Sequence, residues 1–218
     1  MARTNRVQPD GSFATIPARG AFMGNRGCLH DAQGAIRRGH AGKAWITCTL
    51  HERADWGPHP FPVPGRWTPL FFLDEAVACA AGHRPCALCR RAVYNAFCSS
   101  WARAFGTSRK AVEMDSALHA ARIDPVTRKQ RRTLQSARDL PTGAFFLWQD
   151  QAHLIRDGLA LPYADGSYLA PVVPPAGEVI VLTPAPLVDV MAAGWRPAFS
   201  AGEDRPNWQA ISASVREQ

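Results

Sequence analysis

Apolar residues form short runs along the chain, and the spacing within each run predicts short strands and helices. Residues 71–73 are Phe-Phe-Leu, an apolar run typical of a buried strand. Asp74 follows and suits the N-cap of a helix, because its side chain can accept hydrogen bonds from the next turn. Gly82 suits the left-handed residue that ends a helix, and Pro85 prevents the helix from continuing. We therefore expect a strand, a short helix and a turn over this stretch.

The same patterns predict the remaining elements. Strands are expected over residues 22–31, 44–50, 144–148, 152–156, 158–162, 167–173 and 178–182, and helices over residues 87–105, 108–123 and 187–193. Five prolines between residues 56 and 69 predict an irregular loop. One six-residue pattern occurs twice, as residues 80–85 and 192–197, each time with an apolar strand and a helix before it. It indicates either a degenerate repeat or the same helix stop reached twice.

These elements predict an α+β protein with a hairpin-and-helix module, a basic helical segment and a small β-rich module. The expected boundaries are a flexible arm over residues 1–20, the hairpin-and-helix module over 21–106, the basic helical linker over 107–138, the β-rich module over 139–200 and a flexible tail over 201–218. The chain has 218 residues, 46% of them hydrophobic, which is enough to bury a substantial core.

Cysteine spacing carries the first candidate chemistry. Cys86 and Cys89 stand in a Cys-x2-Cys pattern directly after Pro85, which fits half of a tetrahedral zinc site on a tight turn. We expect Cys48 to be the third ligand, because a strand hairpin can present a ligand to such a turn. Cys79 and Cys98 fall on apolar helix faces and are expected in the core.

The fourth ligand stays open among several residues. His30 is favoured, because a hairpin would bring it beside Cys48 on a paired strand. His51 is an alternative, since Cys48-x2-His51 would form a second local half-site. The remaining alternatives are Cys28 and His83.

The stretch Ala-Ala-Gly-His-Arg-Pro-Cys-Ala-Leu-Cys, residues 80–89, with the Phe and Glu-Ala before it, resembles the zinc-binding domain at the N-terminus of the Ada DNA-repair protein. The resemblance covers residues 71–90. It implies Zn²⁺ as cofactor and DNA as partner. In Ada-like domains the other two ligands are cysteines four positions apart on the N-terminal side, and one accepts a methyl group from a DNA phosphotriester. No such pair precedes Phe71 here, so the resemblance implies zinc binding above methyl transfer.

Charge is concentrated in one part of the chain. The net charge is +7, and residues 103–138 hold nine Lys and Arg against three Asp and Glu. The residues expected to contact nucleic-acid phosphates are Arg122, Arg128, Lys129, Arg131 and Arg132. A solvated helix face is the alternative interpretation.

A second group of polar residues shares one predicted helix face. Asp115, His119 and Arg122 stand at helical spacing, so a carboxylate could orient the histidine for acid–base chemistry on phosphate. A surface ion cluster is the competing interpretation.

Taken together, these patterns predict zinc-stabilised nucleic-acid binding, with DNA favoured over RNA. The alternatives are an enzyme that acts on nucleic acid, through a methyl-accepting zinc thiolate or as a phosphate hydrolase, and a protein-interaction module that uses Trp195, Trp208 and the proline-rich loop. No apolar run approaches a membrane span, and residues 1–20 lack the apolar core of a signal peptide, so a cytoplasmic location is expected.

Overall fold

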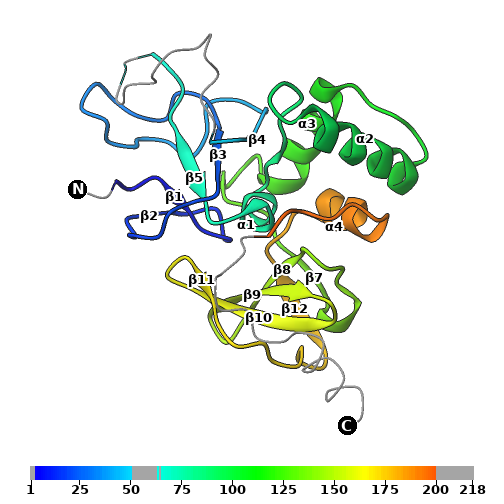
Figure 1. Cartoon of the computed structure of the whole chain (residues 1–218). Coiled ribbons are helices and arrows are strands. Elements are labelled where there is room, and N and C mark those ends of the chain that lie inside the picture. Colours follow the sequence, from blue (N-terminus) through cyan, green and yellow to red (C-terminus); the bar gives the residue numbers. More distant parts are fainter. Residues whose placement is uncertain (1–2, 51–62, 64, 200–218) are drawn as a thin grey trace.

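Two six-stranded sheets and four α-helices make up the described part of the molecule, which confirms the α+β class. The computed structural model describes residues 3–50, 63 and 65–199. The flexible tail expected over residues 201–218 and most of the proline-rich loop lie outside these ranges. In Figure 1 the first sheet is at the upper left and the second at the bottom, with α1 between them.

The first sheet mixes parallel and antiparallel pairs in the order β2-β1-β5-β3-β4-β6. Its strands are β1 (Arg6–Val7), β2 (Phe13–Ala14), β3 (Phe22–Asn25), β4 (Ile46–Cys48), β5 (Leu70–Phe72) and β6 (Arg84–Pro85). The expected hairpin exists, since β3 pairs antiparallel with β4 and Met23 lies opposite Cys48.

The N-terminal segment belongs to this sheet, whereas the sequence predicted a flexible arm. Val7 is 1% exposed and lies in the core, and Arg6 pairs with Phe71 of β5 in parallel register. The strand is only two residues long, so it has too little apolar periodicity to be found in the sequence. Contacts with β5, distant in the sequence, hold it in place.

The second sheet is antiparallel throughout, in the order β11-β10-β9-β8-β12-β7. Its strands are β7 (Thr133–Ser136), β8 (Phe145–Trp148), β9 (Gln151–Arg156), β10 (Leu159–Ala164), β11 (Ser167–Tyr168) and β12 (Glu178–Val181). Gln149 and Asp150 join β8 to β9 with φ values of 49° and 58°. Two consecutive left-handed residues are typical of a tight hairpin turn, which confirms the predicted hairpin.

The helices are α1 (Glu75–Ala80), α2 (Arg91–Phe105), α3 (Ala111–Arg122) and α4 (Ala185–Ala192), and a short 3₁₀ turn η1 spans Ala137–Asp139. Asp74 caps α1 as expected, since its carboxylate accepts from the amide of Val77 at 2.9 Å. The expected basic helical linker over residues 107–138 is α-helical only in α3, with a part of η1 at its end. After Arg122 the chain turns and then forms β7, because pairing with β12 satisfies its backbone in the second sheet.

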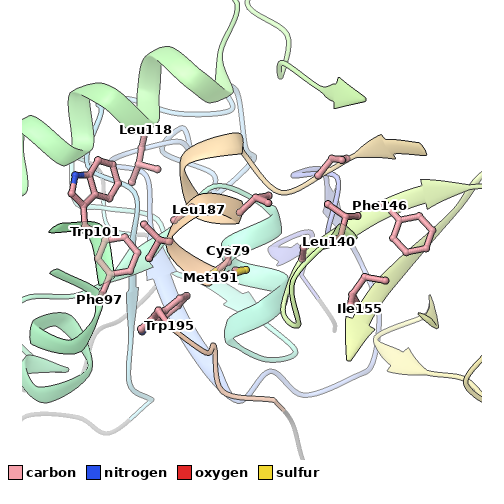
Figure 2. Packing of buried hydrophobic residues seen from close by; sticks show 14 of the residues in the cluster. Cys79, Phe97, Trp101, Leu118, Leu140, Phe146, Ile155, Leu187, Met191 and Trp195 are labelled. Carbon is pink, nitrogen blue, oxygen red and sulfur yellow. The ribbon is translucent and has the colours of Figure 1, made fainter. Parts of the chain in front are cut away.

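Two hydrophobic clusters hold these layers together. The first, here called the helical core, joins α2, α3 and α4 to the second sheet, with Leu187 and Met191 of α4 at its centre (Figure 2). The second, here called the central core, surrounds α1 and joins β1 and β5 to β8, β9 and β10. All six residues of α1 are buried, so this helix packs on every side.

Candidate metal centre and basic surface

Three cysteines meet where β4 and β6 run side by side. Ile46 pairs with Arg84 and Thr47 with Pro85 in parallel register, so Cys48 and Cys86 each follow the last paired residue. The amide of Cys86 donates to the carbonyl of Thr47 at 3.0 Å, which fixes this arrangement. Cys89 returns to the same place from the next turn, and the three sulfur atoms lie within 4.8 Å of one another.

This geometry fits a metal ion held by thiolates. A tetrahedral zinc ion with bonds of about 2.3 Å places its sulfur ligands about 3.8 Å apart, within the spacing seen here. The backbone amide of Leu88 points at the sulfur of Cys86 at 3.4 Å. Such an amide stabilises negative charge on a ligand sulfur. Within the described part of the chain, no other His, Cys, Asp or Glu joins the group of Cys48, Cys86 and Cys89.

The three thiols differ in the direction of their pKa shifts. The pKa of Cys86 is lowered to about 5, chiefly because Cys48 donates a hydrogen bond to its sulfur and then because the amides of Cys89 and Leu88 do so. The pKa of Cys48 is raised, first by that same hydrogen bond and then by burial. Burial also raises the pKa of Cys89. Cys86 is therefore the thiol of the three that loses its proton most readily, and a bound cation would draw the protons from its two neighbours.

The residues considered for the fourth ligand lie elsewhere or outside the described residues. The Nδ1 atom of His30 lies 2.6 Å from the hydroxyl of Thr68, and its Nε2 atom lies 3.2 Å from the carbonyl of Val63. These contacts hold the favoured candidate away from the three sulfurs. Cys28 is also outside the group, and its sulfur approaches the carbonyl of His30 at 3.8 Å. His51 lies outside the described residues.

His83 has a structural position in the core. Its Nδ1–H donates to the carbonyl of Ala78 at 3.2 Å, and its Nε2 accepts from the Nε–H of Arg26 at 3.3 Å. Burial lowers the pKa of this histidine well below its usual value, and the charge of Arg26 adds to the effect. The ring is therefore neutral, and its hydrogen-bond partners do not include the sulfur of Cys48, Cys86 or Cys89.

The predicted phosphate-contacting residues divide into exposed and engaged side chains. Arg122 is fully buried and donates to the carbonyls of Gly82 and Lys43, so it does not face a partner in solution as the sequence predicted. Arg132 is partly buried, and its guanidinium donates to the carbonyls of Asp10 at 2.8 Å and Leu182 at 3.3 Å.

The other three predicted residues, Arg128, Lys129 and Arg131, are exposed on one turn, here called the basic turn. Asp124 organises this turn, because its Oδ1 accepts from the amides of Val126 at 3.0 Å and Thr127 at 2.7 Å. The guanidinium of Arg131 lies 3.7 Å from the Asp124 carboxylate at an exposed position, a weak ion pair. The turn therefore presents its cations from a hydrogen-bonded backbone.

The helix face of Asp115, His119 and Arg122 does not form the predicted cluster. Asp115 accepts a bidentate ion pair from Arg84, with both N–O distances 2.8 Å, and its carboxylate is committed there. His119 instead packs edge-on against His40, with ring centroids 5.1 Å apart.

Sequence reasoning missed the contacts around Trp45. The guanidinium carbons of Arg26 and Arg122 lie 4.1 Å and 3.9 Å from its ring centroid. No local spacing predicts this arrangement, since the three residues come from three segments. Trp195, expected as a contact surface, is 4% exposed and packs edge-on against Phe97 in the helical core.

No helix among the described residues has both the length and the apolar character needed to cross a membrane. Comparison with known proteins found no protein-family model, no curated protein and no solved structure that matches this chain.

Proposed function

We propose that this chain is a zinc-stabilised nucleic-acid-binding protein, with DNA as the favoured partner. The observation that carries the proposal is the meeting of Cys48, Cys86 and Cys89 from two separate segments in a geometry that fits a metal ion. A thiolate-rich donor set favours zinc among common cellular metals.

The metal has a structural part in this proposal. When bound, zinc supplies a cross-link between the end of β4 and the turn after β6. The protein contributes the alignment of Cys48 with Cys86 through the paired strands, and the amide of Leu88 supports the charge on Cys86. The position of Cys86 also bears on the start of α2, because the amide of Arg90, the residue before this helix, donates to the carbonyl of Cys86 at 3.2 Å.

The basic turn supports contact with a polyanion. Its three exposed cations, Arg128, Lys129 and Arg131, lie within four positions, and Asp124 alone stands against them within the turn. Cations on an ordered backbone can contact phosphates with little loss of conformational freedom on binding. Such contacts fix position on the nucleic acid without reading its sequence.

The test is a titration of double-stranded and single-stranded oligonucleotides at several salt concentrations. Changing Arg128, Lys129 and Arg131 together to Gln is expected to weaken binding to unrelated sequences. Each lost duplex phosphate contact removes about 0.9 from the slope of log affinity against log salt, so the slope becomes shallower by about 2 to 3. Stability should change little, because exposed charges contribute little to folding.

A matched control removes three exposed arginines elsewhere, through Arg19→Gln, Arg38→Gln and Arg66→Gln. It lowers the net charge equally and should leave most of the affinity. A parent protein without affinity at low salt would rule out nucleic-acid binding. Equal losses in the two triple variants would place the contact surface outside the basic turn.

A further inference from the structure

Two positive charges are buried together, and no described residue places a carboxylate against them. Arg26 is 3% exposed and Arg122 is fully buried, and they stack on Trp45. Within the described residues neither forms an ion pair. Arg26 donates to His83 and to backbone carbonyls, and Arg122 donates to the carbonyls of Gly82 and Lys43. Burial lowers the pKa of each guanidinium to about 9. Unpaired buried charges are costly unless an opposite charge lies near.

The acidic groups nearest to these arginines are engaged elsewhere. Asp115, which acts on Arg122, is held by the bidentate pair with Arg84. Asp10, which acts on Arg26, is exposed, and its carboxylate accepts from the amide and hydroxyl of Ser12 at 2.9 Å and 2.6 Å. The region therefore keeps an excess of positive charge.

A pair of histidine rings adjoins the Trp45 ring on which the arginines stack. The ring of His40 lies 5.5 Å from that of Trp45 and 5.1 Å from that of His119. Both histidines are partly exposed. The Nδ1 atom of His119 is buried without a hydrogen-bond partner among the described residues, which is unusual for a native imidazole. The surrounding residues therefore leave the hydrogen-bonding capacity of this nitrogen unused.

The charges that face the two rings from the surrounding segments are positive. The pKa of His119 is lowered to about 4, first by burial and then by Arg122, His40, Lys43 and Arg128. The pKa of His40 is lowered by burial and by the charges of Arg128, Arg122 and Arg26. Histidines that are kept neutral by neighbouring cations gain protons when an anion enters.

We propose that His40, His119, Lys43 and Arg128 form a binding site for a phosphate group, with Arg26 and Arg122 as the buried positive charge behind it. The two imidazoles donate hydrogen bonds to the oxygens when protonated, and the charges of Lys43 and Arg128, which act on these rings, add to the attraction. This site goes beyond nucleic-acid binding by the basic turn and needs neither zinc nor a polymer.

Anion binding and protonation of the two histidines favour each other. An anion favours the imidazolium form, so it raises the pKa of His119 and His40, and the affinity must increase as the pH falls. Sulfate keeps its charge over this range and separates protein titration from ligand titration. If the pKa of His119 is raised by about two units, sulfate affinity increases about tenfold between pH 7.5 and pH 5.

The experiment follows the imidazole signals of the metal-loaded protein by NMR, with inorganic phosphate and then sulfate as probes. His40→Gln and His119→Gln assign the signals. We expect both to shift with a common saturation curve. His153, whose Nδ1–H donates to the carbonyl of Gln151 at 3.0 Å in the second sheet, is the internal control and should not move.

A substitution at Arg128 tests the site without changing either histidine, so it does not depend on what the histidines contribute to folding. Arg128 has a φ of 60°, so Arg128→Asn removes the charge with a residue that tolerates this backbone. It should weaken phosphate binding by about fivefold to tenfold, as expected for one lost close charge. Arg109→Asn, at an exposed position between α2 and α3, should change it less than twofold. No shift at millimolar phosphate, an equal shift of His153, or equal losses in the two Asn variants would overturn the proposal.

Competition then identifies the source of the phosphate. A 5′-phosphorylated oligonucleotide that displaces phosphate where its 5′-hydroxyl counterpart does not supports a terminal phosphate. Displacement by both supports a backbone phosphate, and displacement by neither supports a small ligand. Salt titration of Lys129→Gln and Arg131→Gln, which lie outside this site, tests nucleic-acid binding separately.

Discussion

Individual cysteines in this chain differ by what surrounds their sulfur atoms. Cys79 is fully buried in the helical core, as its apolar helix face predicted, and burial raises its pKa well above the usual value. Cys98 packs at the edge of the same core. Cys86 instead receives hydrogen bonds from a thiol and from amides, which lower its pKa. Residue type alone does not separate a core thiol from a candidate ligand, but the presence of donors around the sulfur does.

Replacing one of the three clustered cysteines, Cys48, Cys86 and Cys89, should therefore remove the metal. Cys86→Ser and Cys89→Ser are each expected to reduce the content from about one zinc per chain to less than about a tenth, because structural zinc sites depend on their full thiolate set. Elemental analysis of the purified proteins measures this, and urea unfolding should show a large loss of stability. Cys98→Ser is the control and should retain its zinc. Parent protein without metal, or a Cys86→Ser variant that keeps it, would refute the metal centre.

His30 offers a second test at the residue scale. The sequence favoured it as fourth ligand, whereas the structure gives both ring nitrogens other neighbours, Thr68 and Val63. We expect His30→Ala to cost about 1 to 3 kcal/mol of unfolding free energy through the lost buried hydrogen bonds, with zinc content unchanged. His51→Ala is the comparison, because its spacing from Cys48 suits a ligand. Competition with a colorimetric chelator measures the zinc affinity of both variants. A greater loss of zinc affinity in His30→Ala than in His51→Ala would support the original prediction.

The three clustered cysteines could be predicted from the sequence because local spacing indicates them. Cys86 and Cys89 belong to one turn, and Cys48 was reached because hairpin strands were predicted. Arg26, Trp45 and Arg122 were missed because their contacts join segments far apart in the chain, where no periodicity operates. Arg122 shows the same limit, since its charge predicted exposure whereas the structure stacks it on Trp45.

Helix ends show how far element prediction can go. The two copies of the repeated pattern end α1 and α4 with the same hydrogen bonds. Gly82 donates to Cys79 and His83 to Ala78, and likewise Gly194 donates to Met191 and Trp195 to Val190. Both glycines have a positive φ, 88° and 103°. The glycine stop was predicted in both places because it is a local property of the chain. β7 was missed, because its pairing with β12 is not local.

The two glycines give a matched pair of variants. An alanine at either position suffers left-handed strain of about 1 to 2 kcal/mol. At Gly82 the added Cβ would also lie 2.8 Å from the Cδ atom of the buried Arg122, whereas at Gly194 the nearest atom is 3.5 Å away. We expect Gly82→Ala to cost about 1 to 3 kcal/mol more than Gly194→Ala, as overpacking does. Urea unfolding of both variants measures the difference, and equal losses would contradict the close packing of Arg122 against this helix stop.

The whole molecule is held together across the boundaries expected from the sequence. The helical core contains Trp101 of α2, Leu118 of α3 and Phe146 of β8, and the central core packs α1 against both sheets (Figures 1 and 2). The segment after α4 contributes too, because the backbone of Ala198 exchanges hydrogen bonds with Glu75 at the start of α1. The sequence suggested separate modules because changes in composition mark segments, whereas the packing that joins them involves distant residues.

Shared cores predict that the thiol group and the second sheet unfold together. Leu187 is fully buried on α4 within the helical core, so Leu187→Ala is expected to cost about 2 to 5 kcal/mol. The exposure of Cys86 and Cys89 to a thiol reagent and the far-UV circular dichroism should then shift to lower urea concentration by the same amount. Ile180→Ala, at a side chain that is 41% exposed, should move both transitions little. If Leu187→Ala moved the circular dichroism transition and left the thiols protected at the urea concentration of the parent, the metal centre would be an independent module. Coincident transitions would instead show that α4, which lies far from the three sulfurs in the sequence, helps to hold them in place through the packing of the whole chain.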